Sequence, residues 1–281
     1  MAAVGPGPPA EAPRRPARVR RRRGRPVRIT AAIIAKNEAR NIVDCVRSVA
    51  FCDEVLVVDS GSTDGTPDLA RAEGARVVVT DWPGWVAQKN RAAGLASHDW
   101  VLSLDADERV DARLRAEVER LRAAGEPAAP GFEVTRHVFY LGRWIDHGGW
   151  FPEWRTRLFD RRRARWVGVD PHDRLETDGP PARITVGELQ HFTYRSIAEH
   201  VAQIDRFTTV AAKEKVARGE RGSLLGMLFR PPARFLKMYV LRGGFLDGRA
   251  GFFLAAMAAW YVFLKYAKVW ELGGYGRKAA P

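Results

Sequence analysis

Short apolar runs alternate with helix-forming segments between residues 27 and 110, and this alternation constrains the fold more than any other feature. The apolar runs are rich in β-branched residues and span residues 28–35, 54–60, 75–80 and 99–108. Strands that are separated by helices run parallel, with helices covering both faces of the sheet. The sequence therefore predicts an α/β fold built on a Rossmann-like, mostly parallel sheet.

Polar clusters follow three of these predicted strands at the point where each strand ends. They are Lys36-Asn37-Glu38, the segment DSGSTDGT at 59–66, and the acids of DADE at 105–108. Ligands of such sheets bind beyond the carboxyl ends of the strands. We therefore expect the three clusters to contribute to one site.

Asp105 and Asp107 leave the fourth strand with one residue between them. Carboxylates at this spacing can reach one metal ion, and hard oxygen ligands suit Mg²⁺ or Mn²⁺. A metal that bridges a diphosphate neutralises the charge that develops on a leaving group. Such a pair is common by chance on protein surfaces, so its position at the end of a buried strand supports the metal site.

The segment 59–66 offers glycines, which let a backbone approach a ligand closely, and acids that can accept from a ribose or a base. The alternative is an ordinary loop that caps the next helix. Gln88, Lys89 and Asn90 open a predicted helix whose N-terminus would favour phosphate. Together these features point to a nucleotide.

Residues 130–190 contain short alternating stretches and many Trp and Gly residues, which predict antiparallel strands and long loops. We expect an acceptor or phosphate loop here, formed by Trp150, Glu153, Trp154 and Arg155. Arginine can clamp phosphate and tryptophan can stack on a sugar face. The alternative for each tryptophan is packing in the core.

The ordered segments IIAKNEARNI, VLVVDSGSTDGT, QKN and VLSLDADE resemble glycosyltransferase family 2. The resemblance covers roughly residues 28–215 and is closest to the lipopolysaccharide-core β-glucosyltransferase type. It implies the GT-A fold, a nucleotide-sugar donor such as a UDP-sugar, a divalent metal (Mn²⁺ or Mg²⁺) and inversion at the anomeric carbon.

Carried over by position, the resemblance implies a nucleotide-binding set of Ala35, Lys36, Glu38, Asp59, Ser60, Asp64, Lys89 and Asp105. It implies that Asp105 and Asp107 hold the metal and the diphosphate, with His191 as a further ligand. Many members have a second Asp where this chain has Ser60, which leaves the nucleotide base open.

Inversion requires a carboxylate that removes the proton from the acceptor hydroxyl, without a covalent intermediate. Asp173, which follows His172, resembles the family's His-Glu pair with Asp in place of Glu. We therefore predict Asp173 as the base. Asp170 and Glu176 are the alternatives, because spacing alone does not decide which carboxylate faces the sugar.

The net charge of +13 is unevenly distributed, since residues 1–26 hold eight arginines and one acid. We predict a disordered basic arm at 1–26, a GT-A catalytic domain at 27–217 and a helical region at 218–281. Basic charge attracts any phosphate, including an anionic membrane surface. A nucleic-acid partner is not expected.

The apolar run 250–264 has fifteen residues, whereas a spanning helix needs roughly 20. Lysines and aromatic residues flank it, which favours a segment that lies in the membrane interface. We predict peripheral or monotopic attachment to the cytoplasmic face of the inner membrane. The alternatives are a hairpin that packs on the catalytic domain, one that packs on a second subunit in a homo-oligomer, and a short spanning hairpin.

The resemblance, together with these membrane features, implies transfer of a hexose to a lipid-linked or lipopolysaccharide-core glycan. One alternative is a Mg²⁺-dependent nucleotidyl- or phosphate-handling enzyme, although the chain has no GxxxxGK[ST] loop. The other is a basic module that binds nucleic acid or membrane without catalysis, which the arginine-rich arm would serve.

Overall fold

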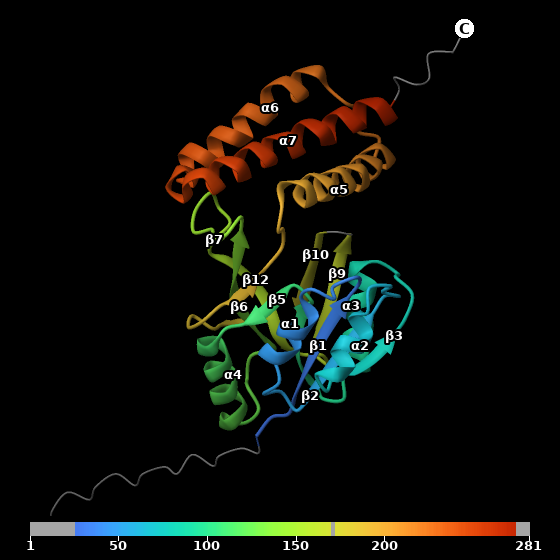
Figure 1. The fold of residues 1–281 in the computed structure, drawn as a ribbon, viewed down its shortest axis with the longest axis vertical. Coiled ribbons are helices and arrows are strands. Elements are labelled where there is room, and N and C mark those ends of the chain that lie inside the picture. Colours follow the sequence, from blue (N-terminus) through green and yellow to red (C-terminus); the bar gives the residue numbers. More distant parts are fainter. Residues whose placement is uncertain (1–25, 170–171, 274–281) are drawn as a thin grey trace, which may run out of the picture.

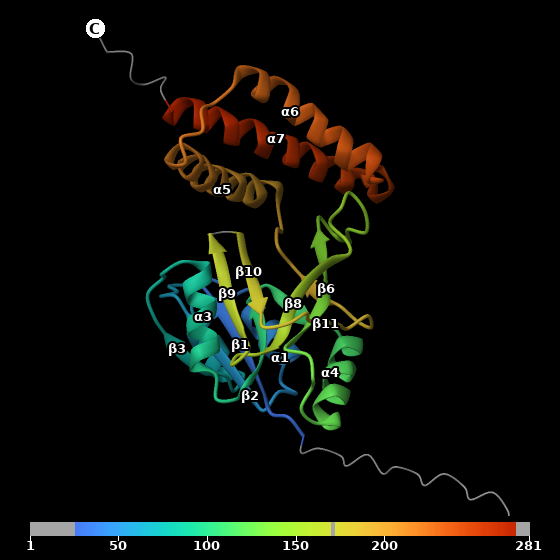
Figure 2. The same cartoon turned by 180° about the vertical axis from the view of Figure 1, so that it is seen from behind.

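The computed structural model describes residues 26–169 and 172–273 (Figure 1). The predicted basic arm lies outside the described residues, except for Pro26. The described chain consists of an α/β part and a layer of three helices that lies against one edge of the sheet (Figures 1 and 2).

Four parallel strands form the N-terminal half of the sheet in the order β3-β2-β1-β4. They are β1 (Ile29–Ala35), β2 (Glu54–Asp59), β3 (Arg76–Val79) and β4 (Trp100–Asp105). In the register, Ala35 pairs with Asp59, and Ile34 pairs with Asp105. The three polar clusters therefore begin at the same edge of the sheet, as the sequence predicted.

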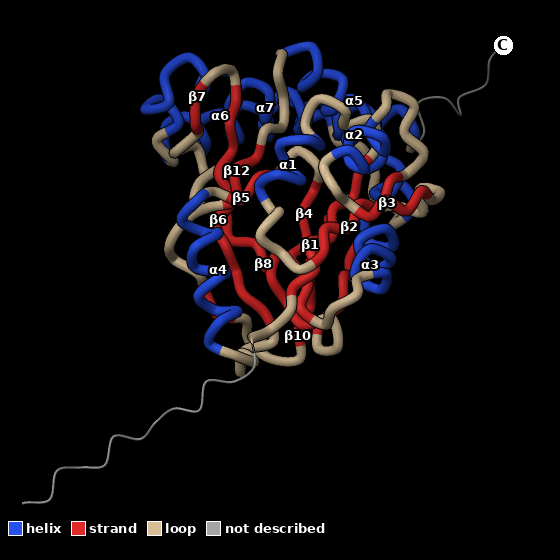
Figure 3. Tube along the Cα trace, turned by 60° about the horizontal axis from the view of Figure 1, so that its bottom comes forward, coloured by secondary structure: helices blue, strands red, loops and turns tan. Residues whose placement is uncertain are grey.

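Helices cover both faces of this half because successive β1 side chains alternate between two apolar clusters. Ile33 packs in the same cluster as Leu114, while Ile34 packs with Ala92 on the other face. Figure 3 shows the strands at the centre, with α4 and α3 on opposite sides. The helices are α1 (Ile42–Ser48), α2 (Thr66–Ala72), α3 (Trp85–Leu95) and α4 (Ala112–Ala124).

The second half of the sheet is largely antiparallel, as predicted for residues 130–190. β8 pairs antiparallel with both β4 and β6, whereas β12 and β11 pair with β6 in parallel. The strands are β5 (Glu108–Val110), β6 (Gly131–Tyr140), β7 (Arg143–Trp144), β8 (Glu153–Asp160), β11 (Ala182–Arg183) and β12 (Leu189–His191).

A separate hairpin of β9 (Ala164–Val169) and β10 (His172–Thr177) packs on helix α3 (Figure 2). The Asn90 amide holds it there: its Nδ2 donates to the Trp166 carbonyl, and its Oδ1 accepts from the Trp166 N–H. Asn90 was predicted to help open a phosphate-facing helix. In the structure its side chain instead positions the hairpin that carries Asp173.

The C-terminal layer comprises α5 (Ile197–Ala217), α6 (Leu224–Leu236), the π-helical turn η1 (Lys237–Leu241), the 3₁₀ turn η2 (Gly244–Asp247) and α7 (Gly248–Leu272). Helix α7 packs against both α5 and α6. Figure 1 shows the layer at the top of the molecule, above the tips of the hairpin strands.

Several polar contacts join this layer to the α/β part. The buried Asp247 carboxylate accepts from the backbone N–H groups of Asp146 and His147. Tyr140 and His200 share a hydrogen bond of 2.9 Å, and Arg40 pairs with Glu199. Because buried polar groups cost free energy unless they are paired, the bonds of the buried Asp247, Tyr140 and His200 hold the layer in place. The Arg40–Glu199 pair is exposed and contributes little.

Two features of residues 223–272 depart from local sequence rules. Pro231 and Pro232 would commonly end a helix, yet they lie inside α6. The fixed φ of proline is itself helical, so the helix continues with lost hydrogen bonds. The apolar run 250–264 was judged too short to span a membrane. It belongs to the longer segment Gly244–Leu272, the one helix of the described residues that is long and apolar enough to do so.

Candidate active site

A cleft of about 1420 Å³ opens at the carboxyl edge of the sheet, between the α/β part and the helical layer. It is lined by the residues that follow β1 and β4, by β8 and β10, and by side chains of α3, α5 and α7. Predicted site residues among its lining are Ala35, Lys36, Glu38, Lys89, Asp105, Asp107, Trp150, Glu153, Trp154, Arg155, Asp173 and His191.

Lys89 connects two carboxylates at the centre of the cleft. Its side chain comes from α3 and the residue is only 4% exposed. Its Nζ lies 2.8 Å from Asp173 Oδ2 and 3.3 Å from Asp105 Oδ1. The same ammonium lies 4.7 Å from the centroid of the Trp166 ring. Lys89 therefore brings the predicted base on β10 beside the first acid of the predicted metal motif.

The environment of Asp105 keeps its carboxyl ionised. Burial alone would raise the pKa of Asp105, but the positive charges of Lys89 and Arg157 outweigh it and hold the pKa well below its usual range. Asp105 Oδ2 accepts from Arg157 Nη2 at 3.1 Å. Its buried Oδ1 pairs with Lys89 Nζ but accepts no hydrogen bond from the described residues, so it retains lone pairs for a ligand.

Beneath Asp105, Glu108 is buried completely between two arginines. Arg157 Nη2 lies 2.5 Å from Glu108 Oε1, and Arg136 Nη1 lies 3.5 Å from the same oxygen. Arg136 also pairs with Glu153 at 2.7 Å. These charges connect β5, β6 and β8, and Arg136, Glu153 and Arg157 also line the cleft.

Asp107 and His191 meet across strands β5 and β12, with 3.1 Å between Asp107 Oδ2 and His191 Nε2. Glu38 faces the same acid: burial first, and then the negative charge of Asp107, raise the pKa of Glu38. Within residues 26–169 and 172–273, no three His, Cys, Asp or Glu side chains are grouped as a formed metal centre. The donor set nevertheless suits a hard cation, because acids gather here and His191 Nδ1 is buried without a hydrogen bond.

Comparison with known proteins identifies the chain. The sequence profile of glycosyl transferase family 2 matches residues 30–175. The lipopolysaccharide core biosynthesis glycosyltransferase LpsC of Rhizobium meliloti is 31% identical over 254 residues, which cover 86% of this chain and 92% of LpsC. The chain belongs to glycosyltransferase family 2. An uncharacterized glycosyltransferase of Rickettsia bellii is also 31% identical and is covered to 87%.

Among solved structures, glucosyl-3-phosphoglycerate synthase from Mycobacterium tuberculosis is similar at 29% identity, with a TM-score of 0.31. The match covers 41% of this chain and 45% of that chain, so it spans less than half of the solved protein. Family membership, with the parallel sheet and its covering helices, establishes a glycosyltransferase of the GT-A fold. It sets aside the phosphate-handling enzyme and the non-catalytic module.

Three residues of the predicted nucleotide set lie outside the lining of the cleft. Asp59 Oδ1 accepts from the N–H groups of Gly61 and Ser62, and Ser60 Oγ accepts from Gln88 Nε2. Asp64 Oδ1 accepts from the N–H and hydroxyl of Thr66. These bonds shape the β2–α2 loop, so contact of Asp59, Ser60 and Asp64 with a nucleotide stays a prediction.

The alternatives to Asp173 are placed as follows. Asp170 lies outside the described residues, and the side chain of His172 does as well. Glu176 is exposed and pairs with Arg174 at 2.5 Å, and it is not part of the lining. Asp173 is therefore the hairpin carboxylate that the described cleft contains.

Several lining residues were missed by sequence reasoning, chiefly Trp82, Trp85, Arg136, Arg206 and Tyr261. Trp82 and Trp85 lie before and at the start of α3, with their rings at 89° and 5.0 Å apart. Arg206 and Tyr261 come from the helical layer. Only the position of that layer over the sheet edge brings them to the cleft.

Proposed function

We propose that this enzyme is an inverting hexosyltransferase that uses a UDP-sugar and passes the hexose to a lipid-linked or lipopolysaccharide-core glycan. The observation that carries the proposal is the meeting of Asp105, Lys89 and Asp173 in one cleft at the carboxyl edge of the sheet. The similarity to LpsC, which is named for lipopolysaccharide core biosynthesis, supports the choice of acceptor. We also propose that the catalytic domain ends at residue 217 and that the helical region follows it.

In this proposal the donor lies between the end of β1 and the end of β4. Ala35, Lys36 and Glu38 contact the nucleoside, and Lys89 contributes positive charge near the diphosphate. Asp105, Asp107 and His191 would hold Mn²⁺ or Mg²⁺. The ion would supply neutralisation of the negative charge on the departing diphosphate.

The transfer itself needs one base. The Asp173 carboxylate takes the proton of an acceptor hydroxyl while that oxygen bonds to the anomeric carbon. The bond from the anomeric carbon to the β-phosphate oxygen breaks at the same time, and UDP leaves with the electron pair. The contact with Lys89 orients Asp173 for this role, because it fixes one carboxylate oxygen and leaves the other free.

A donor screen tests the proposal. Calorimetry with UDP, GDP and several nucleotide sugars is expected to show that UDP compounds bind best and that Mn²⁺ tightens them. Replacement Asp107→Asn should weaken binding in the presence of Mn²⁺ by about tenfold or more, because it removes a charged ligand. The control Asp44→Asn alters an exposed acid of α1 that pairs with Arg109. If Mn²⁺ tightened the binding of UDP compounds to Asp107→Asn as much as to the unmodified protein, the metal assignment would be refuted.

We further propose that the enzyme lies on the anionic cytoplasmic face of the inner membrane, attached through α6. Its outer side presents four apolar residues that are more than half exposed, Leu224, Leu225, Leu228 and Phe229. Arg230, Arg234 and Lys237 follow on the same helix and its extension. Exposed apolar groups beside cations are typical of helices that lie in a membrane interface. Helix α7 then serves as the inner wall of the layer, because it packs on α5 and α6.

Vesicle sedimentation tests this attachment. The protein is expected to bind phosphatidylglycerol-containing vesicles and to bind neutral phosphatidylcholine vesicles more weakly. The double variant Leu228→Glu/Phe229→Glu should lower binding by about tenfold or more, because two apolar side chains no longer enter the interface. Val186→Glu is the control, since Val186 is also more than half exposed but lies in the loop before β12. A stable homo-oligomer that the double variant disrupts, without vesicle binding, would mean that a second copy covers this face.

A further inference from the structure

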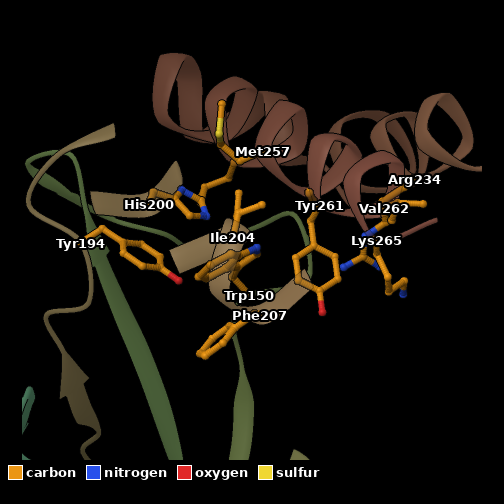
Figure 4. Close-up of a pocket in the computed structure, with 12 residues that line it drawn as sticks. Trp150, Tyr194, His200, Ile204, Phe207, Arg234, Met257, Tyr261, Val262 and Lys265 are labelled. Atoms are coloured by element: carbon orange, nitrogen blue, oxygen red, sulfur yellow. The ribbon is translucent and has the colours of Figure 1, made fainter. Parts of the chain in front are cut away.

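A second cavity of about 460 Å³ lies between α5 and α7, beside the catalytic cleft (Figure 4). Six residues line both spaces: Trp150, Tyr194, Phe207, Arg234, Ala258 and Tyr261. The small cavity therefore opens into the cleft. The donor proposed above occupies the ends of β1 and β4, so it leaves this cavity to another ligand.

One wall of the cavity is apolar. Leu254 and Ile204 are almost completely buried there, and Met257 and Val262 continue the wall along α7. Aromatic rings of Trp150 and Phe207 close it toward the cleft. Walls of this kind bind hydrocarbon and the faces of sugars.

Two cations lie together at one end of the cavity. Figure 4 shows Arg234 and Lys265 at the end opposite His200 and Tyr194. In the part of the chain that the structure describes, neither cation forms an ion pair with a carboxylate, and Lys265 Nζ lies over the rings of Tyr261 and Tyr266. Burial, and then the charges of Lys215, Arg230 and Arg234, lower the pKa of Lys265.

The gathering of like charges has a direct consequence. Partial burial, and then the charge of Arg242, lower the pKa of Arg234 as well, although part of this residue remains exposed. A bound anion would relieve this cost. Arg234 lies on α6, the helix that also carries the proposed membrane face.

We infer that this cavity binds an anionic amphiphile, whose phosphate or carboxylate pairs with Arg234 and Lys265 while its apolar part lies on the wall formed by Leu254 and Met257. The ligand's glycan end extends past Trp150 into the cleft toward Asp173. Its role as the acceptor rests on the proposed transferase function. Its binding does not, so the two can be tested separately.

Calorimetry with dodecyl phosphate below its critical micelle concentration tests the inference. The full-length protein is expected to bind dodecyl phosphate at least about tenfold more tightly than inorganic phosphate or dodecyl maltoside, because only the first offers both charge and chain. The double variant Arg234→Gln/Lys265→Gln should lose about tenfold or more of this affinity. The matched control Lys213→Gln/Arg249→Gln removes the same charge from exposed positions of α5 and α7 that do not line the cavity.

A second variant, Ala258→Leu, fills the junction of the two spaces without changing charge and should also weaken dodecyl phosphate. Unchanged affinity in the charge variant and in Ala258→Leu would overturn the inference. Equal affinity for inorganic phosphate would also overturn it, because the site would then recognise a free anion and not a headgroup.

UDP binding with Mn²⁺ is measured on the same samples. Absence of UDP binding in the unmodified protein, with dodecyl phosphate still bound, would refute the proposed function and leave this inference standing.

Discussion

Replacement Asp173→Asn is expected to lower kcat by about 10²–10⁴-fold, because an amide does not accept the proton of the acceptor hydroxyl. The affinity for UDP-sugar should change less than about threefold, since the new side chain retains an oxygen that can accept from Lys89 Nζ. The measurement is single-turnover transfer at saturating donor, combined with calorimetry of donor binding.

The hairpin supplies a matched control for this variant. Glu176 lies three residues away on the same strand, but it is exposed and pairs with Arg174. Glu176→Gln should therefore leave kcat within about twofold of the unmodified enzyme. If Glu176→Gln or Asp170→Asn were the variant that loses turnover while Asp173→Asn retains it, the base would be another carboxylate of residues 169–176.

The parallel half of the fold was predictable because its determinants are local. Runs such as EVLVVD have the composition of a buried strand, and the residues that follow form the turn into a helix. When parallel strands end at the same height in a sheet, the loops that follow them lie together at the carboxyl edge of that sheet. The positions of Lys36, Glu38 and Asp105 at one cleft follow from that rule alone.

The contacts that organise the site were not predictable in the same way. Lys89 and Asp173 are 84 residues apart, and Arg157 and Glu108 are 49 apart. The residue types at these positions can be read from the sequence. The docking of the β9–β10 hairpin on α3, which joins Lys89 to Asp173, cannot. Asp59 shows the opposite case, since its type suits a ligand but its oxygens are used by its own loop.

The helical layer shows a third kind of difference. Proline inside a helix commonly breaks it, yet α6 continues through Pro231 and Pro232. The length of the apolar run 250–264 was taken from hydrophobic composition alone. In the structure, packing against α5 and α6 extends the helix to Leu272. Both differences arise because helix length in a packed layer is decided by neighbouring helices.

Glu108 carries the largest expected effect on stability. Glu108→Gln should lower the free energy of unfolding by about 3–5 kcal/mol, because two guanidinium groups lose their shared buried counter-charge. Arg157 is 2% exposed, and with Glu108 neutral its remaining ion pair among the described residues is the 3.1 Å contact with Asp105. Urea unfolding followed by tryptophan fluorescence measures the change.

Glu133→Gln is the control, because it breaks a single ion pair with the largely exposed Arg183 and should cost less than about 1 kcal/mol. The double variant Glu108→Leu/Arg157→Met removes the central charge pair together and should recover part of the stability lost in Glu108→Gln. Partial recovery of stability in the double variant would show that the loss in Glu108→Gln came from uncompensated buried charge. A double variant as unstable as Glu108→Gln would instead mean that Glu108 acts through its hydrogen bond from the Asp105 N–H, which holds the turn of the metal motif.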